Sequence, residues 1–191
     1  MPSAKNPYKP KTRSSQNKTA MFPTLHEDVK NNLSEYSINP EPWFNSNEND
    51  RTMLEDYSTF VMGRFECHNQ NCAQRGWGSK KIAITIQRFP NNGYNAVVFK
   101  QRCKSPGCNR LGRLRLDKNS YVERVTYRLK KWAGIPMETP EYDGFEGGPP
   151  HLSKLCEGCK AGRCQMSVGA MASRFRSSTY GHRFLVAQYN E

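Results

Sequence analysis

The chain has 191 residues with a formal net charge of +12, and only 36% of them are hydrophobic, a low share for a self-sufficient core. Its seven cysteines lie in close groups between positions 67 and 164, and this odd number fits a disulfide framework poorly and favours metal binding. No stretch approaches the ~20 apolar residues of a membrane-spanning helix and the N-terminus has no apolar signal, so we expect an intracellular protein of the cytoplasm or nucleus.

The N-terminal part of the chain is polar and changes sign of charge along its length. Residues 1–20 hold five basic and no acidic side chains, a composition that predicts a disordered basic tail. Residues 21–57 are expected to form an acidic extension. Within it, a capping-box pattern beginning at Thr24, followed by apolar residues at helical spacing, predicts a short helix over about 24–33.

The centre of the chain predicts an antiparallel sheet within a domain spanning 58–165. A strand at 59–62 is expected to lead into the first cysteine pair. Isoleucines alternate with other residues from Ile82, a Pro-Asn-Asn-Gly turn follows, and a second alternating run comes next, which together predict a β-hairpin over 80–103. A third strand is expected near 111–116. The hairpin has one cysteine pair before its first strand and another after its second.

The clearest helix signal follows this predicted sheet. Ser120 and Glu123 have the spacing of a capping box, and apolar residues at helical spacing run on to Gly134, a typical C-cap residue. We therefore expect a helix at about 120–132. The predicted fold class is a small α+β, zinc-stabilised domain with a zinc-ribbon-like hairpin, one main helix and disordered basic termini, with a C-terminal tail over 166–191.

The cysteines and one histidine supply eight ligands of the kinds that zinc prefers. Structural zinc takes four thiolate or imidazole ligands in a tetrahedron, so eight ligands fill two Zn²⁺ ions and leave no position for a catalytic water. We therefore expect two zinc ions as the cofactor and no enzymatic activity. His68 is a weaker candidate than His151, because it directly follows a cysteine and is expected to point away. The predicted ligands are Cys67, Cys72, Cys103, Cys108, His151, Cys156, Cys159 and Cys164.

Two groupings of these ligands are compatible with their spacing. In the sequential grouping, the pairs Cys67–Cys72 and Cys103–Cys108 share one ion, and His151 joins the last three cysteines on the other. In the interleaved grouping, the first pair shares an ion with Cys156 and Cys159 instead. Chain geometry favours the sequential grouping, because the hairpin brings the first two pairs to one end.

The basic residues concentrate in one segment. Residues 80–131 hold fourteen Lys or Arg against two acidic residues, which predicts a surface for a polyanion or an acidic partner. We expect RNA or other nucleic acid to be the partner, with Trp77, Tyr94 and Phe99 near enough in sequence to stack on bases. The predicted contacts are Arg88, Lys100, Arg102, Lys104, Arg110, Arg113 and Arg115.

Other interpretations of the same residues remain open. The lysines and arginines are also typical of a solvated sheet edge, where they discourage aggregation. A protein-interaction or chaperone-like adaptor would use the same zinc scaffold to bind an acidic protein. We expect no small-molecule substrate. Trp77 and Trp132 are expected to pack in the core rather than to bind a ligand.

Several short motifs occur in a fixed order along the chain. They are Gly76-Trp77-Gly78-Ser79, Gln101-Arg102-Cys103, and an ending of the form His-x4-Cys-Glu-Gly-Cys-x4-Cys that begins at His151. Together they resemble the 3CxxC-type zinc-finger family, which includes receptor-transporting and zygote arrest proteins of animals and many fungal proteins, the last being the most similar. The first two cysteine pairs here have four intervening residues instead of two. The resemblance implies a structural zinc module, and the zygote arrest branch also implies binding of messenger RNA.

Overall fold

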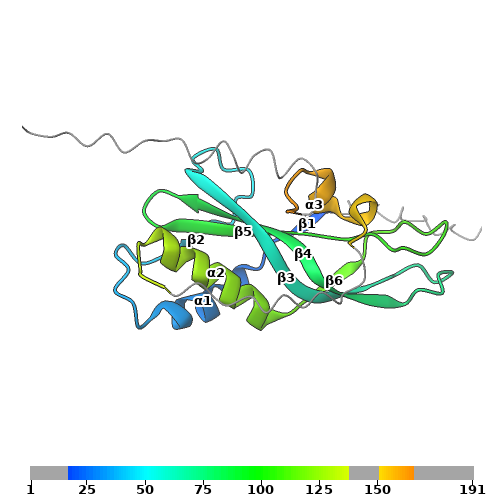
Figure 1. Ribbon diagram of the computed structural model, residues 1–191, viewed down its shortest axis with the longest axis horizontal. Helices are drawn as coiled ribbons and strands as arrows, with labels where there is room; N and C mark the ends of the chain where they lie inside the picture. Colours follow the sequence, from blue (N-terminus) through cyan, green and yellow to red (C-terminus); the bar gives the residue numbers. More distant parts are fainter. Residues whose placement is uncertain (1–16, 138–150, 166–191) are drawn as a thin grey trace, which may run out of the picture.

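The computed structural model describes residues 17–137 and 151–165. One curved sheet forms the centre of the molecule, with α1 and α2 on one face and α3 on the other (Figure 1). The elements in chain order are β1 (Thr19–Ala20), η1 (Pro23–Leu25), α1 (His26–Leu33), β2 (Trp43–Phe44), β3 (Glu55–Glu66), β4 (Gly76–Phe89), β5 (Gly93–Phe99), β6 (Arg113–Leu116), α2 (Lys118–Trp132), η2 (Ser153–Leu155) and α3 (Glu157–Lys160).

The sheet has the strand order β1-β5-β4-β3-β6, with β2 added in parallel to β5 and all other pairs antiparallel. Its central pair, β3 and β4, is long, with 12 and 14 residues. A bulge between Val61 and Gly63 shifts the register of this pair. The predicted hairpin is confirmed as β4 and β5. The strand predicted near 111–116 is present as β6, and it pairs with β3 rather than with a strand of the hairpin.

The core lies on both faces of the central strands. Ile82, Ile84 and Ile86 pack against α1 and α2, and the alternate residue Ala83 packs under the segment that carries the last cysteines. The sequence predicted a half-buried strand, but every residue from Ile82 to Ile86 is buried. The reason is that a chain segment some seventy residues further on covers the second face.

The main helix begins earlier than its sequence signal. Its N-cap is Asp117, whose carboxylate accepts a hydrogen bond from the backbone N–H of Ser120 at 2.9 Å. The predicted capping box at Ser120 was therefore wrong. The Ser120 hydroxyl instead accepts a hydrogen bond from the N–H of Met62 at 3.0 Å, at the bulge of β3, so this residue joins helix to sheet.

The N-terminal segments belong to the same core. Thr19 of β1 pairs with Phe99 of β5, although the sequence placed it in a disordered tail; the hydrogen bonds of β5 supply what its own composition lacks. The short predicted helix is present as η1 and α1, and no side chain caps it, so the predicted capping box at Thr24 was wrong. Both Trp77 and Trp132 pack against the core while staying partly exposed. Within the described residues, the helices are all too short or too polar to cross a membrane.

Candidate metal centres

The first ligand set consists of Cys67, Cys72, Cys103 and Cys108 and lies where β3 ends and β4 begins. The sulfur atoms of Cys67 and Cys108 are 3.6 Å apart, as are those of Cys72 and Cys103, and all four lie within 4.8 Å of one another. Four sulfurs bound to zinc at about 2.3 Å are separated by about 3.8 Å. The first set therefore has the size of a tetrahedral zinc site.

The two loops of this set, 67–72 and 103–108, form the same backbone hydrogen bond. In each loop, the N–H of the second cysteine donates to the carbonyl of the residue two positions after the first cysteine, which is Asn69 in one loop and Ser105 in the other, both at 3.0 Å. The N–H of that same residue donates to the sulfur of the first cysteine. Because such bonds stabilise thiolates, the four-residue spacing still forms a turn suited to zinc.

The acidity of these thiols is set by amide donors and by burial. The backbone N–H of Arg110, together with the side-chain amide of Asn69, lowers the pKa of Cys108 to about 6. Burial raises the pKa of Cys103 to about 12. A bound cation deprotonates its thiol ligands outright, and four adjacent thiolates need such a cation to offset their repulsion. The donor chemistry therefore fits Zn²⁺.

The second ligand set consists of His151, Cys156, Cys159 and Cys164 and lies on the sheet face opposite α1 and α2. The Nε2 atom of His151 is 3.1 Å from the sulfur of Cys159 and 3.5 Å from that of Cys164. Cys156 and Cys164 are buried against Ala83 and neighbouring residues of the sheet. These separations match three thiolates and one imidazole around one zinc ion.

The structure thus assembles the sequential grouping and not the interleaved one, and the two sets fit two zinc ions. His68 is exposed and belongs to neither set within the described residues. His26 is half-buried, with its Nδ1 atom 3.0 Å from the hydroxyl of Tyr94. His182 lies outside the described residues.

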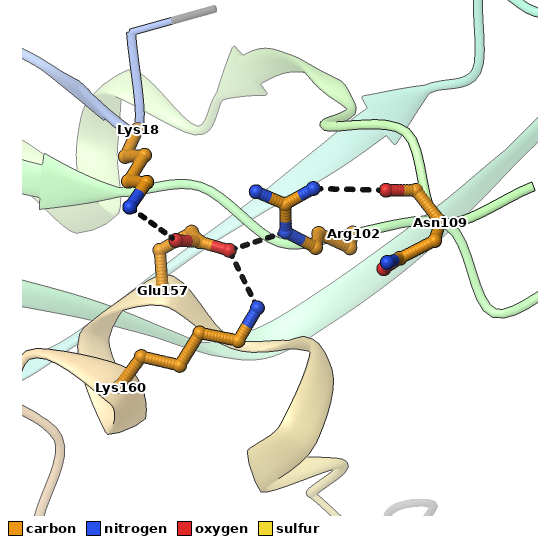
Figure 2. Close-up of polar contacts among 5 residues, drawn as sticks. All are labelled: Lys18, Arg102, Asn109, Glu157 and Lys160. Atoms are coloured by element: carbon orange, nitrogen blue, oxygen red, sulfur yellow. Dashed lines mark hydrogen bonds and ion pairs between the residues drawn. The ribbon is translucent and has the colours of Figure 1, made fainter.

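Sequence reasoning missed a buried carboxylate between the two sets. Glu157, in the Cys-Glu-Gly-Cys motif, has a side chain only 2% exposed. Its carboxylate contacts three cations (Figure 2). The distances are 2.5 Å to Nε of Arg102, 2.9 Å to Nζ of Lys160 and 3.9 Å to Nζ of Lys18. Burial by itself raises the pKa of Glu157, but hydrogen bonds from Lys160 and Arg102 outweigh it and leave that pKa below its usual value. The only signal in the sequence was an acid inside a metal-binding motif.

The seven predicted nucleic-acid contacts are spread over different environments. Arg88 pairs with Glu55 at 2.8 Å, where β3 begins, so it lies at the opposite end of that strand from the first ligand set. Arg102 is held by buried Glu157 and also donates to the carbonyl of Asn109 at 3.0 Å. These two arginines have structural partners that the charge count could not reveal.

The other five predicted contacts lie between β5 and β6 or on β6 itself. Burial lowers the pKa of Lys100, which is half-buried. Arg115 is exposed and pairs with Glu66 at 2.9 Å. The remaining three are exposed and have no ion pair among the described residues: Lys104, Arg110 and Arg113.

The aromatic residues considered for base stacking are largely enclosed. Tyr94 and Phe99 are buried, with 0% and 8% exposure. Trp77 is half-buried, with its ring stacked on Phe65 at 5.2 Å and its Nε1 donating to Gln101 at 3.2 Å. Tyr94 and Phe99 are therefore not available to stack on bases.

Comparison with known proteins agrees with the geometry of these centres. A family model described as a zinc-binding domain, Zn_ribbon_3CxxC, matches residues 60–162, which is more than half of the chain. No curated protein and no solved structure matches the chain. On the family match and the two assembled ligand sets, the chain belongs to the 3CxxC zinc-ribbon family of zinc-binding domains.

Proposed function

We propose that this zinc-binding module binds RNA through phosphate contacts on the surface around the first ligand set. The observation that carries the proposal is a group of exposed cations that form no ion pair among the described residues, which we name the basic rim. Lysines and arginines gathered on one face are what phosphate binding requires. The basic rim consists of Arg64, Arg75, Lys104, Arg110 and Arg113.

The zinc loops and the sheet edge position these residues. The carbonyl of Arg75 accepts the N–H of Cys67, and that of Arg110 accepts the N–H of Cys103, so both arginines are fixed to the loops of the first ligand set. On the edge of the sheet, Arg64 lies opposite Arg115 in register, and Arg113 lies opposite Glu66, whose carboxylate pairs with Arg115. Directly opposite residues share a sheet face. The zinc ion would therefore hold the loop residues of the basic rim in place, and the sheet holds Arg64 and Arg113.

A structural explanation covers part of this charge. Four thiolates and one Zn²⁺ form a doubly negative centre, and nearby lysines and arginines stabilise it. Exposed charges are screened by water, however, and contribute little to such stabilisation. The basic rim also carries more charge than the centre requires. Phosphate binding accounts for its exposure, which charge compensation does not.

The buried aromatics indicate the mode of contact. Sequence-specific recognition of single-stranded RNA relies on bases stacked against exposed aromatic rings. With Tyr94 and Phe99 buried and one face of Trp77 covered by Phe65, we expect contacts to phosphates rather than to bases. Binding should therefore depend steeply on salt and weakly on sequence.

Fluorescence anisotropy with labelled RNA at several salt concentrations tests this proposal. Each lost phosphate contact lowers the salt slope by about 0.7 for a single strand and about 0.9 for a duplex. We expect the double variant Arg110→Glu/Arg113→Glu to weaken binding and lower the slope by roughly 1.4 to 1.8.

The matched control reverses two exposed charges at the other end of the molecule, Arg51→Glu/Lys131→Glu. Arg51 lies just before β3, and α2 runs from Met62 toward Tyr57, so Lys131 also lies near the beginning of β3. Equal loss of affinity in both double variants would contradict a localised surface. If RNA does not bind even at low salt, the adaptor function is favoured.

We also propose that both zinc ions are structural rather than catalytic. Each set offers four protein ligands, which fill a tetrahedron. Cobalt substituted for zinc should give a tetrahedral absorption spectrum that added azide leaves unchanged, and an azide-induced shift would reveal an open position. Thiolate ligands of this kind need a reducing environment, which supports a cytoplasmic or nuclear location.

A further inference from the structure

The neighbours of the zinc ligands form a direct connection between the two sets. Gln101 and Cys156 form an isolated antiparallel bridge. Beside it, the N–H of Arg102 donates to the carbonyl of Leu155 at 2.7 Å, and the N–H of Glu157 donates to the carbonyl of Lys100 at 3.0 Å. The backbone that enters the second ligand set is therefore paired with the backbone that leads to Cys103.

The side chain of Arg102 extends this connection to a further ligand loop. Its Nε atom donates to the carboxylate of Glu157, next to Cys156, and a second guanidinium nitrogen donates to the carbonyl of Asn109, next to Cys108 (Figure 2). One arginine thus contacts the residue beside a ligand of each set. The carboxylate it binds is almost fully buried, so this pair is shielded from solvent.

We propose that the Arg102–Glu157 pair couples the two zinc sites, so that the chain gains and loses its two zinc ions together. The four-residue helix α3 is too short to persist without the metal that Cys156 and Cys159 would bind. When it loosens, Glu157 withdraws from Arg102, and Asn109 loses the arginine that holds the loop of Cys108. By thermodynamic reciprocity, zinc loss at the first set weakens the second by the same factor.

Native mass spectrometry of the full chain during titration with a zinc chelator tests this coupling in the wild type. Two equal and independent sites give about half of the molecules one zinc ion at half-loading, and unequal sites give more. A tenfold coupling lowers that share to about a quarter. We expect a quarter or less. A one-zinc share of half or more would overturn the proposal, which rests on the zinc sets and not on RNA binding.

The variant Glu157→Gln removes the charge while keeping the size of the side chain. We expect it to raise the one-zinc share at half-loading to about half or above. The matched control is Glu66→Gln, since Glu66 adjoins the ligand Cys67 and pairs with Arg115, but at the surface. The control should behave as wild type, and an equal rise in both variants would overturn the assignment to Glu157.

A second variant guards against a failure of Glu157→Gln to fold. Arg102→Gln leaves Glu157 with Lys160 at 2.9 Å, so the buried charge keeps a partner while the connection to Asn109 is lost. We expect the same rise in the one-zinc share. A wild-type distribution in this variant would show that the arginine does not carry the coupling.

Discussion

Gly158 is the position where the second ligand set meets the sheet most closely. A methyl group built at Gly158 would lie 2.5 Å from the Cβ atom of Ala83 and 3.3 Å from that of Phe99. Ala83 is completely buried in the central strand β4 and has no rotamer that could relieve the contact. Gly158→Ala should therefore lift the loop of the second set away from the sheet.

The loss of folding free energy in Gly158→Ala follows from these contacts. Adding a methyl group to a well-packed core typically destabilises by about 1–3 kcal/mol, and a contact shorter than 3.0 Å against a side chain that cannot rotate belongs at the upper end. For a domain of this size, we expect Tm to fall by roughly 5–12 °C. The matched control is Gly78→Ala, which lies in β4 as Ala83 does and has nothing within 4 Å of the added methyl group.

Thermal unfolding with saturating zinc, followed by circular dichroism, measures the difference. Saturation matters because zinc binding contributes to the apparent stability of the folded state. The double variant Gly158→Ala/Ala83→Gly removes the colliding atom and should recover part of the lost stability. If Gly158→Ala is as stable as Gly78→Ala, or if Ala83→Gly restores none of the lost stability, the loop of the second set does not pack closely against Ala83.

Two further predictions concern zinc and the main helix. Native mass spectrometry should find two zinc ions in the intact chain and one, bound more weakly than in the wild type, after Cys156→Ser/Cys159→Ser. Chelation should unfold the domain because structural zinc contributes about 10 kcal/mol or more, and a folded chain that never binds metal would refute this. Asp117→Ala should cost about 0.5–2 kcal/mol in urea unfolding because it removes the N-cap of α2, whereas Glu123→Ala, in the capping box predicted from sequence, should change little.

The fold could be predicted from sequence wherever the signal was local. Alternation through Ile82 and the turn after Phe89 were enough for the hairpin, and helical spacing was enough for α2. The pairing of β6 with β3 could not be predicted, because the sequence offered β6 more than one strand to pair with. The N-cap of α2 was predicted wrongly for a related reason. Ser120 has a capping pattern, but its hydroxyl accepts a hydrogen bond from the N–H of Met62 in the sheet.

The metal ligands could be predicted from the sequence because zinc restricts both the number and the type of side chains that bind it. Cysteine spacing fixed the candidates, and the hairpin placed two pairs at one end. The role of Glu157 could not be predicted, since its partner Arg102 is 55 positions away in sequence and only the bridge at Gln101 brings the two together. A charge count assigned Arg102 to a partner outside the chain, whereas the fold supplies one within it.

Arg102 and Lys104 flank the same ligand, Cys103, and show how one run of positive charge serves two purposes. Arg102 faces the buried carboxylate of Glu157, whereas Lys104 is exposed and has no ion pair among the described residues. Arg102→Glu would bury two carboxylates side by side and should reduce the zinc content. Lys104→Glu should retain both zinc ions and weaken only RNA binding. Zinc content and RNA affinity that fall together in both variants would contradict this division, because an exposed lysine has no means of reaching the metal.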